Sequence, residues 1–197
     1  MTSDTLLSYE LSAKMADLYN RMEKVYDDVA RKIDFSCAGC PDNCCDSFFL
    51  HHTYVEWAYL WEGLHLLDKA RLDEIRLRAG EYVAGSEKIL SQGARPVIMC
   101  PLNESGRCSL YLHRLMICRM HGVPSEITMP NGRKMHFPGC FRCQELVGEQ
   151  ADCWVVDRTG LYKELVALET EFLGAKRAVM PKVKMTIAGM IVLGPPG

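Results

Sequence analysis

The sequence predicts a mainly α protein: a single α-rich domain whose long N- and C-terminal helices pack around an irregular, cysteine-rich, metal-binding centre with one small β-hairpin. Three observations support this class. Apolar residues recur at helical spacing near both ends, periodicity fades over residues 94–150, and ten of the 197 residues are cysteine. The length suits one domain spanning 1–197. With 48% apolar and 24% charged residues, the composition excludes global disorder.

Two long helices are predicted, over residues 6–34 and 159–180. In the first, apolar residues alternate at spacings of four and three to form a seam of Leu11, Met15, Leu18, Met22, Val25 and Val29. The second repeats this spacing with Leu161, Leu165, Leu168, Phe172, Ala175 and Val179. Thr159 is its expected cap, and Pro181 lies just beyond it. We expect the two seams to pack together or share a core, although they would also suit a homo-oligomer.

Two further helices are expected between them. Thr53-x-x-Glu56 has the pattern of a capping box and predicts a short, aromatic-rich helix ending near Leu66. Asp68 then caps a helix over about 69–91, which ends at Gln92-Gly93.

The centre and the tail of the chain are less regular. Pro130-Asn131-Gly132 is a turn signal between two short strand-like stretches, Glu126–Met129 and Lys134–Phe137. These stretches form the predicted hairpin. The apolar tail over 183–197 would either dock as an edge segment or associate with a partner, and both readings stay open.

The first cysteine arm reads Cys37-x-x-Cys40-x-x-x-Cys44-Cys45. A gap of two residues between cysteines lets both sulfurs turn toward one ion. Neighbouring side chains diverge, so Cys44 and Cys45 are not expected to ligate the same ion terminally. Either each faces a different centre, or one is a spare thiol.

The second cysteine arm lies in residues 100–143, and neither arm alone supplies a complete, evenly spaced ligand set. The two arms, roughly 55 residues apart, must therefore fold onto each other to close a site. Residues 100–143 hold six basic but only two acidic side chains. Guanidinium groups would stabilise the negative charge of a metal–thiolate centre. A solvated basic loop is the second reading, and a site for a small anion or nucleic acid is the third.

The order of these cysteine motifs carries a resemblance. Cys-x2-Cys-x3-Cys-Cys is followed by Cys-Pro-Leu, Gly-x-Cys-x-Leu-Tyr, Cys-Arg-x-x-Gly-Val-Pro and a late cysteine pair. Over about residues 35–145 this resembles the CxxCxxxCC-type cysteine-cluster family of zinc- or iron-chelating domains. The resemblance implies metal binding through about eight cysteines: Cys37, Cys40, Cys44, Cys45, Cys100, Cys108, Cys118 and one of Cys140 or Cys143. The family often has Arg-Pro before the cysteine matching Cys118, where this chain has Arg114-Leu-Met-Ile.

The expected function is a metal-binding protein that holds an iron–sulfur cluster, with zinc as the alternative, and serves electron transfer or redox sensing. Zinc prefers closed four-sulfur sites, whereas iron–sulfur sites tolerate uneven spacing, so the spacing favours iron–sulfur. Two alternatives remain: a structural zinc module serving protein interaction, and a thiol redox enzyme. No dinucleotide loop, phosphate-binding loop or nucleophile elbow is present in the sequence, so no catalytic residue is assigned.

Histidines are secondary candidates. Five lie in or beside the arms, namely His51, His52, His113, His121 and His136, and His121 follows Cys118 by three residues. Cys153 is expected to be a small buried hydrophobic residue.

Partners and location follow from charge and from what the chain lacks. The net charge of −2 argues against nucleic acid. No apolar run is long enough to span a membrane. The start of the sequence lacks a signal peptide, so we expect a cytoplasmic protein with reduced thiols and a redox or protein partner.

Overall fold

The computed structural model describes residues 6–38, 40, 44–148 and 154–197. The predicted mainly α fold is confirmed. In this part of the chain the helices are α1 (Tyr9–Lys32), α2 (Tyr54–His65), α3 (Lys69–Ser91), α4 (Met116–Met120), α5 (Phe141–Val147), α6 (Thr159–Leu173) and α7 (Ile187–Leu193). Short 3-10 helices occupy Cys44–Asp46, Tyr111–His113 and Gly174–Ala178.

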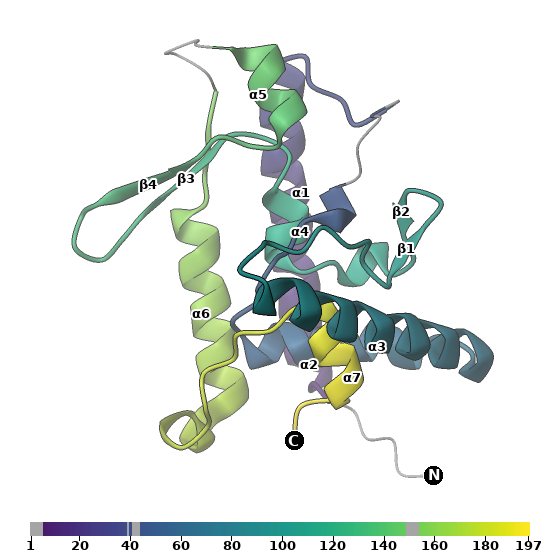
Figure 1. Ribbon diagram of the computed structural model, residues 1–197. Coiled ribbons are helices and arrows are strands. Elements are labelled where there is room, and N and C mark those ends of the chain that lie inside the picture. Colours follow the sequence, from purple (N-terminus) through teal and green to yellow (C-terminus); the bar gives the residue numbers. More distant parts are fainter. Residues whose placement is uncertain (1–5, 39, 41–43, 149–153) are drawn as a thin grey trace.

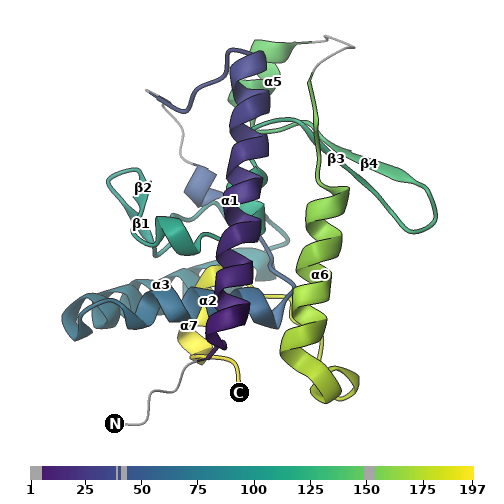
Figure 2. The same ribbon diagram turned by 180° about the vertical axis from the view of Figure 1, so that it is seen from behind.

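Helix α1 runs beside α6 along the length of the molecule (Figures 1 and 2). It begins where the Ser8 side chain accepts a hydrogen bond from the Leu11 N–H, as an N-cap does. The predicted seam is buried except for the half-buried Val25. On the helix surface, Lys14 pairs with Glu171 at 2.9 Å. The two seams are thus used within one chain, whereas self-association stays a prediction.

Helix α6 is shorter than predicted. It ends at Leu173 because Gly174 adopts a φ of +49°, and the chain continues as a 3-10 helix to Ala178. The last two seam positions, Ala175 and Val179, are consequently exposed.

The predicted cap of α6 is also wrong. Thr159 is already helical, and its hydroxyl accepts from the Thr128 N–H at 2.8 Å. Asp157 accepts the Thr159 N–H instead, also at 2.8 Å.

Helix α2 is capped from another helix. Glu169 of α6 accepts the N–H groups of Tyr54 and Val55 at 3.0 and 2.8 Å. Thr53 occupies the predicted cap position, but its hydroxyl donates to the Glu56 carboxylate at 2.7 Å and makes no cap bond. A carboxylate that is distant in the sequence therefore takes the place of the expected capping box. Its negative charge also interacts favourably with the positive end of the helix dipole.

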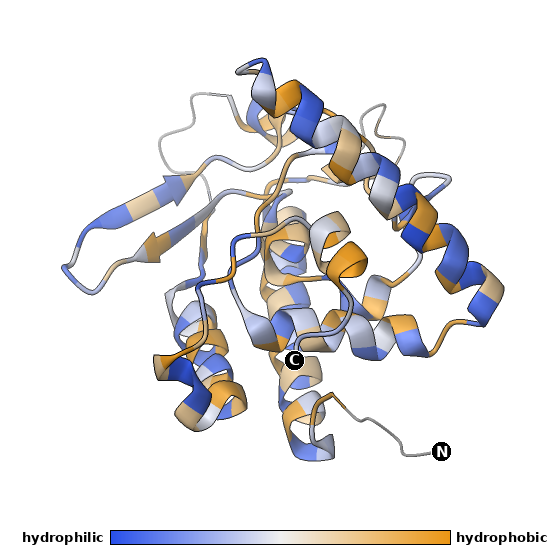
Figure 3. Cartoon of the chain, turned by 60° about the horizontal axis from the view of Figure 1, so that its bottom comes forward, coloured by the Kyte–Doolittle hydropathy of each residue, from blue (hydrophilic) through white to orange (hydrophobic). Residues whose placement is uncertain are grey.

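The apolar tail forms α7, which packs on α3 (Figure 3). The indole N–H groups of Trp57 and Trp61 donate to the Met190 carbonyl at 3.1 and 3.0 Å. Thr186 caps α7 by accepting the Gly189 N–H. The docking reading of the tail is thus the one found: Met185 forms an antiparallel β-bridge with His51, and the residues after it dock as a helix.

The hairpin of β3 (Ser125–Thr128) and β4 (Lys134–Phe137) confirms the prediction. The structure adds strands that the sequence did not indicate. β5 (Val156–Asp157) joins β3 in parallel, and β1 (Asn103–Glu104) pairs with β2 (Arg107–Cys108) in a second, antiparallel pair. The sequence predicted one hairpin, whereas the described residues contain a second antiparallel pair and a third strand beside β3.

Two hydrophobic clusters underlie the site. One gathers around α1, α4 and α6, and the other around α2, α3 and α7. In the part of the chain described here, no helix combines the length and apolar character needed to cross a membrane.

Candidate metal centre

The two cysteine arms meet. The backbone N–H of Cys100 donates to the carbonyl of Cys45 at 2.8 Å, which ties the second arm to the first. Beside this bond is a cavity of about 710 Å³. Seven of the nine predicted ligands line it: Cys37, Cys40, Cys44, Cys45, Cys100, Cys108 and Cys118.

Tyr26 of α1 joins Cys37 to Cys140. Its hydroxyl lies 4.0 Å from the Cys37 sulfur and packs directly against Gly122. The Gly122 carbonyl in turn accepts the Cys140 N–H at 3.1 Å. Burial raises the pKa of Tyr26, and the Cys37, Cys140 and Cys44 thiols raise it further. One tyrosine thus links the first arm to the start of α5.

Cys44 lies among thiols of both arms. Burial raises its pKa to about 12, and the neighbouring thiols of Cys140, Cys37, Cys40 and Cys45 add to the effect. Without a cation the sulfur therefore keeps its proton at neutral pH, and a bound metal would reverse this preference.

Residues 100–108 form a tight loop closed by the β1–β2 pair. The Ser109 N–H donates to the Leu102 carbonyl at 2.8 Å. Backbone N–H groups two residues onward point at the sulfurs: that of Leu102 at Cys100, and that of Leu110 at Cys108. Burial raises the pKa of both thiols, to about 12 for Cys100, and each N–H bond acts in the opposite direction. Such N–H groups would stabilise a thiolate.

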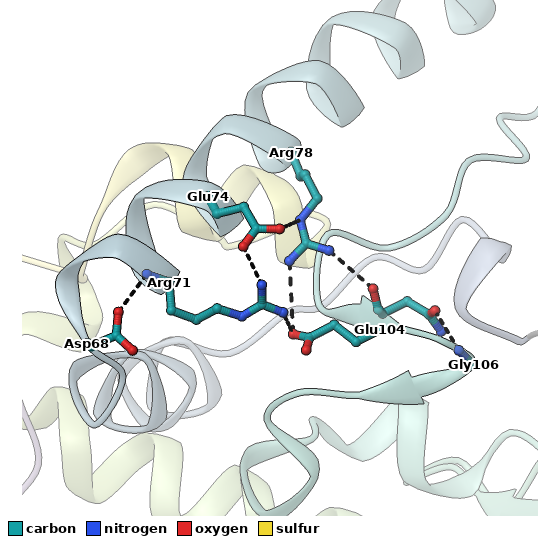
Figure 4. A network of polar contacts seen from close by, with 7 residues as sticks. Asp68, Arg71, Glu74, Arg78, Glu104 and Gly106 are labelled. Atoms are coloured by element: carbon teal, nitrogen blue, oxygen red, sulfur yellow. Dashed lines mark hydrogen bonds and ion pairs between the residues drawn. The ribbon is translucent and has the colours of Figure 1, made fainter.

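A polar network fastens this loop to α3 (Figure 4). Glu104 forms ion pairs with Arg71 and Arg78, and Arg71 also pairs with Glu74. Arg78 additionally donates to the Asn103 carbonyl at 3.2 Å. The loop that carries Cys100 and Cys108 is therefore held on a long, regular helix.

Cys118 is carried by α4, whose start is fixed by a buried carboxylate. Glu56 accepts the Met116 N–H at 2.8 Å and the Tyr19 hydroxyl at 2.9 Å. Burial raises the pKa of Cys118, and the Cys100 thiol adds to the effect.

Two guanidinium groups lie around Cys118. Arg114 donates to the Cys118 carbonyl and lowers the pKa of this thiol against the effect of burial. Arg119 is buried and donates to the carbonyls of Arg114 and Leu112, both at 2.6 Å, so it braces the loop before α4. The positive charge predicted around the cysteines is thus placed at the second arm.

The late cysteines differ in position. Cys140 stands at the N-cap of α5, close to Cys44 and Tyr26. Cys143 is completely buried in the cluster around α1. Cys153 lies outside the described residues.

Three of the five candidate histidines line the cavity: His51, His113 and His121. Burial lowers the pKa of all three, to about 4 for His51. His121 also packs edge-on against Phe49, with ring centroids 4.9 Å apart. The other two candidates have partners of their own, since His52 Nδ1 lies 3.2 Å from the Val183 carbonyl and His136 lies 3.5 Å from Glu126.

Among the residues described, no group of three or more His, Cys, Asp or Glu side chains is arranged to hold a metal ion. Ligation would therefore require the sulfurs to close in around it. The chemistry of the set nevertheless fits a soft or borderline metal: clustered thiols, N–H groups aimed at two sulfurs, and guanidinium groups at the second arm.

Sequence reasoning missed Tyr26 and Glu56 as parts of the site. Tyr26 follows the seam residue Val25, and nothing in the helical period marks it as a neighbour of cysteine. Glu56 carried a signal, the pattern Thr53-x-x-Glu56, but this was interpreted as a local cap.

Comparisons of the chain with protein-family models, curated proteins and solved structures found no match. The likeness to the cysteine-cluster family therefore stays a prediction, and the function is argued from the site.

Proposed function

We propose that this chain binds an iron–sulfur cluster through cysteine thiolates contributed by two distant arms. The observation that supports this most directly is the bond between the Cys100 N–H and the Cys45 carbonyl, which brings the arms together beside seven cavity-lining thiols. When bound, such a cluster supplies one-electron redox chemistry.

Each part of the site would have a separate task. The sulfurs ligate after losing their protons. The N–H groups of Leu102 and Leu110 stabilise the resulting thiolates. Arg114 offsets part of their negative charge. The network around Glu104 keeps the loop in place on α3 while this happens.

Zinc is the competing ion. It favours closed four-sulfur sites, and thiols from evenly spaced knuckles are its usual ligands. Here the spacings are uneven and guanidinium groups lie close to the second arm, both of which favour iron–sulfur.

The exposure of two thiols supports a redox role. Cys37 and Cys44 are exposed, whereas Cys100, Cys108 and Cys118 are half-buried. A cluster bound partly by exposed sulfurs is reachable by an electron-transfer partner. We therefore favour electron transfer or redox sensing over a purely structural role.

Anaerobic purification of the full chain, followed by analysis of iron, zinc and acid-labile sulfide, tests the proposal. We expect brown protein that contains iron and sulfide, with absorbance near ~400 nm that bleaches on reduction. The variant Cys100→Ser/Cys108→Ser should lose part or all of the iron. Ser47→Ala, another cavity-lining residue, is the matched control and should keep it.

Colourless protein with stoichiometric zinc would replace the iron–sulfur proposal by the zinc one. Protein that holds neither metal, and whose thiols all react readily with an alkylating reagent, would overturn metal binding altogether and favour a thiol redox function.

A further inference from the structure

We infer that eight of the cysteines form two separate four-thiolate centres. The outer centre consists of Cys37, Cys40, Cys44 and Cys140, and the inner centre of Cys45, Cys100, Cys108 and Cys118. The inference rests on the proposed metal binding and adds the number of centres, their ligands and their unequal exposure.

The outer group is assembled around Tyr26. This side chain touches the Cys37 sulfur, and Gly122 beneath it accepts the Cys140 N–H. Arg142, two residues after Cys140, donates to the Ala38 carbonyl at 3.4 Å, so the start of α5 is bonded to the Cys37–Cys40 turn. The thiols that raise the pKa of Cys44 are, in order of effect, Cys140, Cys37 and Cys40, which are the other three of this group, and then its sequence neighbour Cys45.

The inner group is assembled around the 100–108 loop. The Cys45 carbonyl accepts the Cys100 N–H, and β1 pairs Asn103 with Cys108. The thiols that raise the pKa of Cys118 are Cys100, Cys108 and Cys45, which are the other three members of this group.

The division falls between two adjacent residues. Cys44–Asp46 is a 3-10 helix, closed by the Ser47 N–H bonding to the Cys44 carbonyl at 3.2 Å. With three residues per turn, successive side chains point about 120° apart. Cys44 and Cys45 are thereby directed to different sides. Four thiolates complete the coordination of a tetrahedral ion or of a cubane cluster, so two groups of four leave neither centre short of ligands.

The two centres are not equivalent. The outer one includes two exposed thiols, Cys37 and Cys44, whereas none of the inner thiols is exposed. The Arg114 guanidinium lowers the pKa of both Cys108 and Cys118 of the inner group, against the effect of burial. The outer centre is therefore the one that solvent and chelators reach first.

Titration of the full-length, reduced chain with Co²⁺ under anaerobic conditions tests the inference. Cobalt bound by thiolates absorbs strongly, and the ion occupies zinc-type sites without requiring cluster assembly. We expect saturation at two equivalents per chain. Saturation at one equivalent would overturn the two-centre inference and leave metal binding intact, and so would the absence of thiolate-bound cobalt in a chain that is purified with iron or zinc. A chain that takes up no cobalt and holds neither iron nor zinc would overturn both.

Paired variants assign the ligands. Cys37→Ser/Cys140→Ser and Cys100→Ser/Cys108→Ser should each bind one equivalent, and the combination of all four changes should bind none. Ser91→Ala, at an exposed position of α3, should still bind two. If either double variant alone abolished binding while circular dichroism showed native helix content, a single mixed site would be the correct description.

A chelator challenge of the single variants Cys44→Ser and Cys45→Ser gives a second test. It does not depend on whether the double and quadruple variants fold. Release of cobalt to excess EDTA should show two phases. Cys44→Ser should remove the fast phase, and Cys45→Ser the slow one. One phase in the wild type, or the loss of the same phase in both variants, would contradict separate outer and inner centres.

Discussion

The hydroxyl of Tyr26 packs so closely on Gly122 that a Cβ at position 122 would lie 1.9 Å from its oxygen. This contact places α1 against the segment that holds Cys140. A glycine is required there for space, because any side chain would displace the tyrosine.

Gly122→Ala should therefore lower the free energy of unfolding by about 1–3 kcal/mol, the usual cost of overpacking. Adding Tyr26→Phe removes the closest atom and should restore part of this loss. Gly80→Ala is the matched control, because nothing lies within 4 Å of its Cβ in the exposed part of α3. That change should stabilise by roughly 0.5–1 kcal/mol. Denaturant unfolding measures all three, and a neutral Gly122→Ala would show that the contact is not tight.

Glu56→Ala should destabilise the protein strongly. The buried carboxylate accepts from Tyr19, Thr53 and Met116, and each buried donor left without a partner costs ~1–3 kcal/mol. We expect a loss of at least about 2 kcal/mol in denaturant unfolding. Glu87→Ala, on the exposed face of α3, should stay within about 0.5 kcal/mol of the wild type. Equal effects of the two changes would refute the anchoring role of Glu56.

Glu169→Ala should cost about 1–2 kcal/mol, because α2 loses the acceptor for its first two N–H groups. Glu169→Gln keeps a single carbonyl oxygen and should lose less. Thr53→Ala is informative beside them, since Thr53 makes no cap bond. If Thr53→Ala reduced the helicity of α2 as much as Glu169→Ala, as followed by hydrogen exchange of Tyr54 and Val55, the local capping box would be the correct interpretation.

His51 should make the fold sensitive to acid. Its folded pKa is lowered to about 4 by burial, whereas an unfolded histidine has a pKa of about 6.5. Between these values the unfolded state binds more protons, so stability falls as the pH drops from about 6.5 to 4, by up to about 3 kcal/mol.

Carboxylates titrate in the same range, so the measurement is the difference between variants. His51→Leu should flatten the pH dependence of the unfolding free energy from 6.5 to 4, whereas His65→Leu, at an exposed position of α2, should not. The same slope in both variants would exclude His51 as the cause.

Sequence periodicity predicted both α1 and α3. Asp68 was the expected cap of α3, and it accepts the Arg71 N–H three positions onward. The predicted start of α1 at residue 6 was too early, because Ser8 caps a helix that begins at Tyr9. The cap of α2 could not be predicted in this way. Its acceptor, Glu169, lies 115 residues from Tyr54, and only the packing of α6 beside α2 brings them together.

In the candidate site, too, local features could be predicted from the sequence and long-range contacts could not. The spacing of the cysteines indicated that two arms must meet and that Cys44 and Cys45 diverge. The β1–β2 pair was not foreseen, since its position depends on Arg71 and Arg78 of α3 reaching Glu104. Likewise, α7 depends on indole donors from α2 that the tail itself does not encode.

The pairing of α1 with α6 also bears on biosynthesis. A nascent chain emerges from the ribosome N-terminus first, and the apolar stripe of α1 packs on α4 as well as on α6. Part of this stripe therefore stays uncovered until residues 159–173 have been translated. The thiols at 37–45 leave the exit tunnel long before their counterparts at 100–140, and we expect inorganic cargo to be inserted only into the finished polypeptide.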